Sequence, residues 1–263
     1  MDLSLNGRRA LVCGASKGIG KAIAIELASL GAQVTVLARS AETLTSVCEG
    51  LPRPSEQRHT SIVADVEVPD ELIHSVEDHV NSYGAFHICV NNTGGPAGGL
   101  LVESSVESIV QAFENHVVMA HRLMQVLVPG MKVENWGRFI NIISTSVKQP
   151  LEGLGVSNTV RGAMASWAKT LATEVAPWGI TVNNVLPGAT ETERLAGIID
   201  RTVERTGRTD AEVRTRMVGE IPVGRFGRPE EIAAAAAFLA TPAAAYITGT
   251  SILVDGGRTR TLS

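Results

Sequence analysis

The sequence predicts a single α/β domain built on a doubly wound parallel sheet. Short β-branched runs alternate with longer helical segments along the whole chain, as in successive βαβ units. The 263 residues are enough for one domain of this class with a sizeable core. Aromatic residues are few, with 5 Phe, 3 Trp and 2 Tyr. The core must therefore consist of Ala, Val, Leu and Ile, which is typical of helix-covered parallel sheets.

The first half of the chain contains four expected strands. They cover residues 9–13, 33–38, 61–64 and 86–90, where β-branched and other apolar side chains cluster. A helix over residues 18–30 follows the first strand and is closed by Gly31. Pro69 begins another helix, because proline is tolerated in the first helical turn.

The second half continues the alternation. A helical pattern covers roughly residues 103–131, and a helix over about 156–176 separates strands at 138–143 and 180–185. An alanine-rich helix at 230–240 precedes a last strand at 251–254. In sheets of this class, ligands bind at the carboxyl ends of the strands, where the winding changes direction. We therefore expect the functional site at that edge.

Composition excludes several classes of protein. The net charge of −4 argues against a nucleic-acid binder that relies on bulk positive charge. The longest apolar run, residues 232–240, is far shorter than the ~20 residues of a membrane span. Three cysteines without C-x-x-C spacing, and scattered histidines, argue against a disulfide framework or a metal site. With no signal-peptide pattern at the start, we expect a cytoplasmic protein that binds neither nucleic acid nor membrane.

The first strand leads into a glycine-rich turn with the spacing G-x-x-x-G-x-G, which opens the first helix. Glycines let the backbone approach a phosphate closely, and the helix N-terminus offers N–H groups to a pyrophosphate. A glycine cluster of this kind also occurs in ordinary turns. The dinucleotide contacts expected here are Gly14, Ser16, Lys17, Gly18, Ile19 and Gly20.

The end of the second strand indicates which dinucleotide binds. An acidic residue at this point would bind the adenosine ribose hydroxyls. The sequence has Arg39 instead, and Lys17 lies in the glycine-rich turn. Two cations suit a 2′-phosphate, so NADP is favoured over NAD. The alternative interpretation is that Arg39 is a solvated loop residue.

Five motifs, spread over nearly the whole chain, occur in the order and spacing of a known family. They are the glycine-rich turn, Asn91-Asn92-Thr93-Gly94, Pro187-Gly188 with Thr190 and Thr192, GRFGRPEE at 224–231, and ITG at 247–249 followed by VDGG at 254–257. On these motifs the chain resembles the short-chain dehydrogenase/reductase family, close to its 3-oxoacyl-(acyl-carrier-protein) reductase-like subgroup. The resemblance implies one Rossmann-like domain over residues 1–263, a nicotinamide cofactor, and a homotetramer or homodimer.

The resemblance also assigns further cofactor contacts. It implies that Asp65 and Val66 meet the adenine, that Asn91 and Gly94 line the adenosine side, and that Pro187, Gly188 and Thr190 hold the nicotinamide half. Cys13 stands where the family usually has threonine, and we interpret it as a small buried apolar residue.

The catalytic residues depart from the family pattern, which is Asn, Ser, Tyr and Lys. Asn115 matches the asparagine and Ser144 the serine, but the Tyr-x-x-x-Lys site holds Ser157 and Arg161. The chain's tyrosines lie elsewhere, so the standard proton donor is absent. Arg161 can still bind ribose hydroxyls, but an arginine stays protonated and cannot relay protons.

Lys148 is a candidate replacement donor. It follows Ser144 in the loop at the rim of the expected site. A desolvated lysine there could act as an acid, with Ser157 and Ser144 binding the substrate oxygen. The alternative is that Lys148 is an ordinary solvated loop residue.

Three functions follow as hypotheses. The first is an NADP-dependent oxidoreductase for a small carbonyl or alcohol substrate, with an atypical site and a substrate lid at about residues 190–222. The second is a cofactor-binding protein of low turnover that serves as a sensor or partner subunit. The third is a lyase or isomerase on the same fold, since fold does not fix function.

Overall fold

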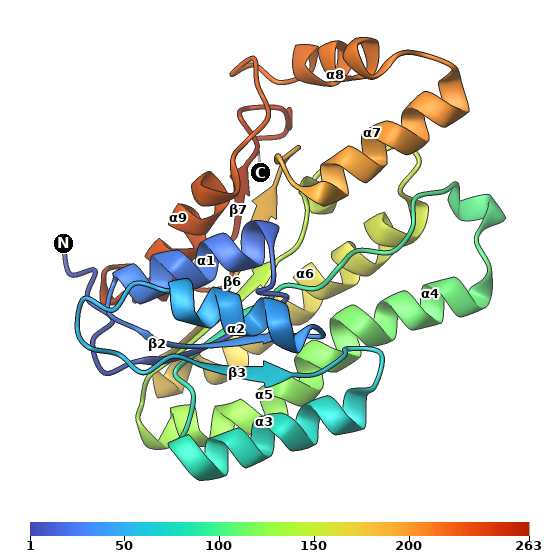
Figure 1. Ribbon diagram of the computed structural model, residues 1–263. Coiled ribbons are helices and arrows are strands. Elements are labelled where there is room, and N and C mark those ends of the chain that lie inside the picture. Colours follow the sequence, from blue (N-terminus) through green and yellow to red (C-terminus); the bar gives the residue numbers. More distant parts are fainter. Residues whose placement is uncertain (263) are drawn as a thin grey trace.

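Parallel strands in the order β3-β2-β1-β4-β5-β6-β7 form one sheet in the computed structural model, which describes residues 1–262 (Figure 1). The strands are β1 (Arg9–Cys13), β2 (Gln33–Ala38), β3 (Thr60–Val63), β4 (Ile88–Asn91), β5 (Gly137–Ile142), β6 (Ile180–Pro187) and β7 (Ser251–Val254). The chain order reverses between β1 and β4, which lie side by side, and this is the point where a doubly wound sheet binds its ligands. The predicted fold class is confirmed.

Helices cover both faces of the sheet (Figure 1). They are α1 (Gly18–Ser29), α2 (Ala41–Gly50), α3 (Pro69–Tyr83), α4 (Val106–Phe113), α5 (Met119–Val133), α6 (Gly155–Val175), α7 (Glu193–Thr206), α8 (Asp210–Gly219) and α9 (Pro229–Ala240). Side chains alternate between the faces along each strand. In β1, Ala10 and Val12 pack against α1, α2 and α9, whereas Leu11 and Cys13 pack against α3, α5 and α6.

The helical pattern expected over residues 103–131 is less regular than the sequence indicated. A short 3-10 turn, Leu101–Glu103, precedes α4, and a π-helical segment, Glu114–Val118, separates α4 from α5. A π-helical turn changes the direction in which the following side chains point, and such turns are frequent at functional sites. This segment carries Asn115, one of the expected catalytic residues.

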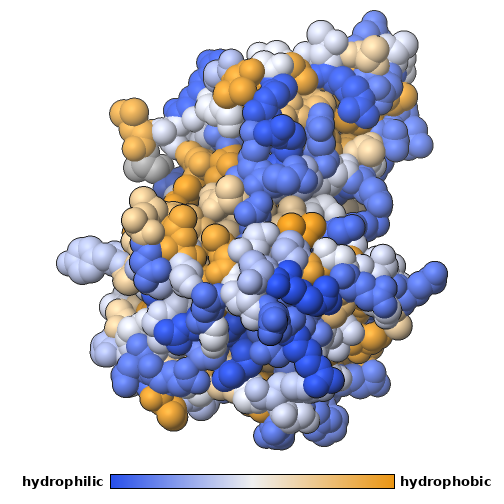
Figure 2. All heavy atoms as spheres, turned by 60° about the vertical axis from the view of Figure 1, so that its left-hand side comes forward, coloured by the Kyte–Doolittle hydropathy of each residue, from blue (hydrophilic) through white to orange (hydrophobic). Residues whose placement is uncertain are grey.

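Helices α7 and α8 project beyond the carboxyl ends of the strands, at the top of Figure 1. They pack on each other around a small apolar cluster that includes Leu195, Ile199 and Val213 and is separate from the cores beside the sheet. Figure 2 shows the surface narrowing below this projection, with hydrophobic residues exposed at that level. The two helices therefore stand over the edge where the site is expected.

No helix within residues 1–262 combines the length and the apolar character that crossing a membrane requires.

Candidate active site

The glycine-rich turn joins the end of β1 to the start of α1. Gly14 has a φ of +60°, and a Cβ on it would lie 2.4 Å from the backbone oxygen of Asn92. A Cβ on Gly20 would lie 2.2 Å from the backbone oxygen of Gly14. Glycine is therefore required at both positions. The side-chain amide of Asn92 donates to the carbonyl oxygens of Cys13 and Gly14, at 3.3 and 3.2 Å, and holds the turn in place.

The N-terminus of α1 is open to an anion. Lys17 occupies its N-cap position without a side-chain capping hydrogen bond, and the first turn has no acidic residue. The backbone N–H groups of that turn need an acceptor from outside the helix. Ser16 and Ile19 are partly buried in the same turn. The closely packed glycines and the uncapped helix end therefore fit the pyrophosphate of a dinucleotide.

The ends of the parallel strands bring the other expected cofactor residues to the same edge. Arg39 follows β2 and is exposed, with its Nη1 3.8 Å from the Oδ2 of Asp65 after β3. Val66 lines a cavity at this edge. Thr190 is buried, and its hydroxyl donates to the carbonyl oxygen of Gly188, 3.1 Å away. Gly94 is exposed in the loop after β4, and Pro187 ends β6.

A row of asparagines crosses the sheet below this edge. The Nδ2 of Asn91 donates to the Oδ1 of Asn141 at 2.8 Å, and the Nδ2 of Asn141 donates to the Oδ1 of Asn184 at 2.9 Å. These residues are aligned partners on β4, β5 and β6. The side chain of Asn91, which the resemblance placed on the adenosine side, therefore also ties neighbouring strands together.

The beginning of α7 reaches back over the cleft. Glu193 forms an ion pair with Lys17, and the Nη1 of Arg194 donates to the carbonyl oxygen of Gly95 at 3.0 Å. The side chain of Thr192 lies against Gly18, with its Cγ2 only 3.3 Å from the place of a Cβ on that glycine. These contacts connect the first lid residues to the glycine-rich turn and to the loop after β4. Sequence reasoning did not assign Arg194 or Glu193 to the site.

Ser144 directly follows the segment that continues β5. Its Oγ accepts a hydrogen bond from the backbone N–H of Ser146, 3.1 Å away, and so begins the 3-10 turn Thr145–Val147. Lys148 comes directly after this turn and is partly exposed. Its ammonium group forms no ion pair or hydrogen bond with another residue in the part of the chain that the structure describes. The geometry leaves the hypothesis of Lys148 as proton donor untested.

The first turns of α6 carry Ser157 and Arg161, the two residues that the sequence predicts in place of the family's tyrosine and lysine. Ser157 is buried, and Arg161 is only 7% exposed. The Nη1 of Arg161 donates to the carbonyl oxygen of Ile142 at 3.1 Å. Burial, and secondarily the charge of Arg194, lowers the pKa of Arg161 to about 10. Arg161 therefore stays protonated at neutral pH, as the sequence indicated.

The π-helical segment contributes two neighbouring side chains. The Oδ1 of Asn115 accepts from the Nε2 of Gln111 at 2.9 Å. His116 is buried, and its Nδ1 is hydrogen-bonded to the hydroxyl of Thr93. Burial, followed by the charges of Arg161 and Arg194, lowers the pKa of His116 to about 3, so its imidazole is neutral near pH 7. In the sequence, the only indication that His116 belongs to the site is its position next to Asn115.

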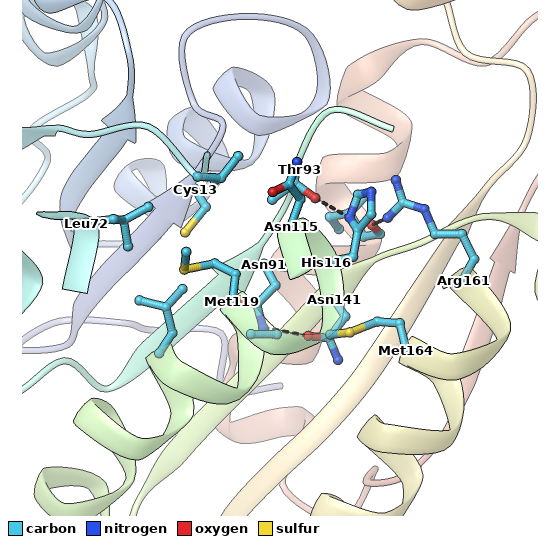
Figure 3. A pocket seen from close by; sticks show the side chains of 14 residues that line it. Cys13, Leu72, Asn91, Thr93, Asn115, His116, Met119, Asn141, Arg161 and Met164 are labelled. Carbon is cyan, nitrogen blue, oxygen red and sulfur yellow. Dashed lines mark hydrogen bonds between the residues drawn. The ribbon is translucent and has the colours of Figure 1, made fainter. Parts of the chain in front are cut away.

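A small cavity of about 20 Å³ connects these elements, with room for one water molecule. Figure 3 shows Arg161 reaching from α6 toward His116, with Thr93 on the other side of the imidazole. Asn115 and Arg161 both line the cavity, whereas Ser144, Ser157 and Lys148 do not. Cys13 lies at its far end, where burial raises the pKa of the thiol to about 12. Within residues 1–262, no three His, Cys, Asp or Glu side chains form a group that could hold a metal ion.

Comparisons with known proteins match nearly the whole chain. Residues 14–259 match a family model described as enoyl-(acyl carrier protein) reductase. The chain is 35% identical to the 3-oxoacyl-(acyl-carrier-protein) reductase FabG of Pseudomonas aeruginosa, over 97% of this chain and 98% of that relative. The chain belongs to the short-chain dehydrogenase/reductase family. The expectation of an oxidoreductase is confirmed at the level of this family.

Solved structures of two reductases superpose on nearly the whole chain. L-sorbose reductase from Gluconobacter frateurii, complexed with NADPH and L-sorbose, has a TM-score of 0.92 and 33% identity, with 100% of both chains covered. YwfH, an NADPH-dependent reductase involved in bacilysin biosynthesis, has a TM-score of 0.91 and 29% identity, with 97% of this chain and 99% of that chain covered. The predicted single-domain Rossmann-like fold is therefore confirmed.

Proposed function

We propose that this protein is an NADP-dependent oxidoreductase that transfers a hydride between nicotinamide and a carbonyl or alcohol substrate, with an atypical proton donor. One arrangement carries the proposal. The glycine-rich turn, fixed by Asn92, lies at the same sheet edge as Ser144, Asn115 and Arg161. The NADPH named for both structural relatives supports NADP as the cofactor. Lys17 and Arg39 are the cations that suit its 2′-phosphate.

Residues of this chain bind the substrate, hold the charge and supply the proton. When bound, the nicotinamide cofactor supplies or accepts the hydride. Ser144 holds the substrate oxygen, and Arg161 keeps a positive charge where the family has lysine. Because Arg161 cannot pass a proton, the proton comes from another group. Lys148 is our candidate for that group, with Ser157 as a second hydroxyl beside the substrate oxygen.

Helices α7 and α8 support the proposal of a substrate lid at about residues 190–222. They share a small apolar cluster with Ile221 and Phe226, so they can move together with the segment that follows α8. Their connection to the body at the cleft includes the Lys17–Glu193 pair and the Arg194 hydrogen bond to Gly95. Both interactions involve exposed side chains, which contribute little to stability. Breaking these two interactions therefore costs little free energy.

A homodimer or homotetramer is the expected assembly, and α4 supports it. Val106, Val110 and Phe113 lie one turn apart on this helix and are exposed, with Val106 at 71%. A row of apolar side chains on one helix face is typical of an interface. Light scattering after size exclusion measures the assembly, and a monomeric mass would contradict it. The cysteines are unpaired, which agrees with the cytoplasm as the place of action.

The decisive experiment has two stages. NADPH is first titrated by fluorescence, and then its absorbance is followed with a panel of ketones, an acyl thioester and an enoyl thioester. The enoyl compound belongs in the panel because the family model is described by that reaction. Binding followed by absorbance decay with a ketone supports the proposal. Binding without decay across the panel supports the low-turnover sensor or partner subunit, and failure to bind NADPH overturns both.

A further inference from the structure

Helix α7 separates its charged side chains into two lines. Along this helix an acid directly precedes an arginine three times, in the pairs Glu193-Arg194, Asp200-Arg201 and Glu204-Arg205. The later members of each line lie seven and eleven residues after the first, which is close to two and three full turns at ~3.6 residues per turn. Successive residues of a helix point about 100° apart, so the line of acids and the line of arginines face different directions. The two charges balance in number along α7 but not on each side of it.

Two contacts at the start of α7 fix the direction in which each line faces. Glu193, the first member of the acid line, forms an ion pair with Lys17 in the glycine-rich turn. Arg194, the first member of the arginine line, donates from its Nη1 to the carbonyl oxygen of Gly95 at 3.0 Å, in the loop after β4. The acid line is therefore turned toward the side where the dinucleotide is expected, and the arginine line toward the loop after β4.

The loop after β4 forms one wall of the cleft together with the loop after β5. The N–H of Gly99 donates to the carbonyl oxygen of Gly153 at 2.8 Å, and the N–H of Gly155 donates to the carbonyl oxygen of Gly99 at 3.1 Å. Ser144, which is expected to hold the substrate oxygen, begins the second of these loops. The arginine line of α7, which extends away from the sheet in Figure 1, therefore starts on the substrate side of the cleft.

Positive charge dominates on this side. Partial burial, and secondarily the charge of Arg201, lowers the pKa of Arg194, so the two guanidinium groups are near each other. Neither has a carboxylate within ion-pair distance in the part of the chain that the structure describes. In the wall, residues 93–102 contain no acid, and residues 144–155 contain Lys148 and the exposed Glu152. Most N–H donors of the two arginines are thus available to an anionic ligand.

We propose that Arg194 and Arg201 bind an anionic group of the substrate, so that the substrate is a ketone or alcohol with a carboxylate or phosphate on the chain beyond its reacting carbon. This inference rests on the proposed function and names its substrate class. The two residues are about 10 Å apart along the helix axis, so long side chains from both can converge on one anion. The planar guanidinium forms parallel hydrogen bonds with carboxylate and phosphate oxygens alike.

The anionic group takes no part in the chemistry. In reduction, the carbonyl carbon receives a hydride from NADPH and the carbonyl oxygen receives a proton. The C=O bond becomes a C–OH group, NADPH becomes NADP⁺, and the carboxylate or phosphate is unchanged. Its binding to α7 orients the carbonyl toward Ser144 and holds the lid over the substrate.

Binding of unreactive anions tests the site without turnover. Glutarate, methyl phosphate and the neutral glutaramide are titrated calorimetrically into the protein, with and without saturating NADP⁺, at an ionic strength of ~0.15 M. At least one of the two anions should bind in both states, and glutaramide should bind at least about tenfold more weakly than glutarate if the group is a carboxylate. Arg194→Gln should weaken binding of the anion about tenfold, and Arg201→Gln about three- to tenfold.

Two control variants separate direct contact from the overall field of the protein. Arg216→Gln removes an exposed arginine of α8 that lies outside the arginine line, and changes the net charge by the same amount. Asp200→Asn removes a charge from the acid line, next to Arg201 in the sequence. Both should change anion affinity by less than about twofold, because exposed charges are screened at this ionic strength. Changes as large as those of the Arg194 and Arg201 variants would show a general field and overturn the inference.

Matched substrates test the same point in turnover and distinguish the two anions. Levulinate is compared with methyl levulinate, and dihydroxyacetone phosphate with dihydroxyacetone. In the wild type kcat/KM should be at least about tenfold higher for the anion in one of the pairs, the first for a carboxylate and the second for a phosphate. This ratio should fall toward one in Arg194→Gln and Arg201→Gln.

The outcomes separate this inference from the proposed function. Equal anion affinity in the wild type and in both arginine variants overturns the inference, as does failure of both anions to bind. Exclusion of the anion by saturating NADP⁺ also overturns it, because the cofactor would then be the anion that these arginines bind. Turnover of the neutral ketones as fast as their anionic counterparts overturns the inference and leaves the proposed function standing. Anion binding that depends on Arg194 and Arg201, without any binding of NADPH, overturns the proposed function and leaves the anion site.

Discussion

The guanidinium of Arg161 donates a hydrogen bond to the carbonyl oxygen of Ile142, at the last residue of β5. This bond joins the second turn of α6 to the strand end from which Ser144 follows two residues later. The position of the positive charge is thus fixed relative to the hydroxyl expected to hold the substrate oxygen. If Arg161 stands in place of the family lysine, as the sequence predicts, the site keeps a cation and lacks a group that can exchange protons.

The first prediction concerns the proton donor. Lys148→Met should lower kcat for a ketone substrate about 10²- to 10⁴-fold, the usual contribution of a positioned acid. Ser157→Ala should lower it about tenfold, the effect of one lost hydrogen bond. Lys169→Met, on the exposed side of α6, is the control and should leave kcat unchanged. Steady-state kinetics measure these rates, and unchanged kcat in both test variants would remove Lys148 and Ser157 from the mechanism.

The second prediction concerns cofactor choice. In the nucleotide-free protein Glu193 neutralises Lys17, one of the cations expected at the 2′-phosphate of NADP. Glu193→Gln should therefore tighten NADPH binding about two- to fivefold at low salt, since an exposed ion pair is worth up to about 1 kcal/mol. NADH binding should change less, because NADH lacks that phosphate. Fluorescence titrations with both nucleotides measure the effect, and an equal change for the two would exclude Lys17 from 2′-phosphate recognition.

The third prediction concerns the row of asparagines under the site. Asn141 is buried and both accepts from Asn91 and donates to Asn184. Asn141→Ala leaves the buried Oδ1 of Asn184 and the partly buried Nδ2 of Asn91 without partners, which should lower the free energy of unfolding by about 2–5 kcal/mol. Denaturant unfolding measures this loss, with the exposed Asn81→Ala on α3 as the control. A loss no larger than in the control would mean that water replaces the missing amide.

The fourth prediction concerns pH. The pKa of His116 is about 3 in the folded chain and ~6.5 when unfolded. The unfolded chain therefore binds one more proton between these values, so stability falls as the pH drops below about 6.5. His116→Gln removes this contribution, and its loss of stability between pH 7 and pH 5 should be about 2 kcal/mol smaller than in the wild type. Urea unfolding at both pH values measures the difference, and identical losses would show that His116 is accessible to protons.

The sequence predicted the elements that rest on strong periodicity or on required glycines. The sheet, the turn at Gly14 and Gly20, and helix α1 that follows this turn depend on apolar runs and steric limits that each act within a short segment. Helix α2 was not predicted, because its polar sequence has only Leu44 and Val47 buried. The π-helical segment was also missed, since a single widened turn leaves no periodic signal.

The electrostatics of the site could not be predicted from the sequence and became visible only in the structure. The sequence identified Arg161 as a replacement for lysine, but not that it is buried without a carboxylate beside it. Arg194 meets the carbonyl oxygen of Gly95, which lies 99 residues earlier in the chain. Thr93 and His116, which are hydrogen-bonded to each other, are 23 residues apart in the sequence. Contacts of this kind depend on how strands and helices pack, and no local pattern of residues contains them.

The central claim is that a dinucleotide lies across the carboxyl edge of the sheet with its reactive ring beside Ser144. A crystal structure of the protein with NADP⁺ tests this most directly. The account predicts the pyrophosphate on the N–H groups of Gly18 and Ile19, and the nicotinamide within reach of Ser144 and Arg161. A nucleotide bound away from the glycine-rich turn, or with its nicotinamide remote from Ser144, would contradict the claim.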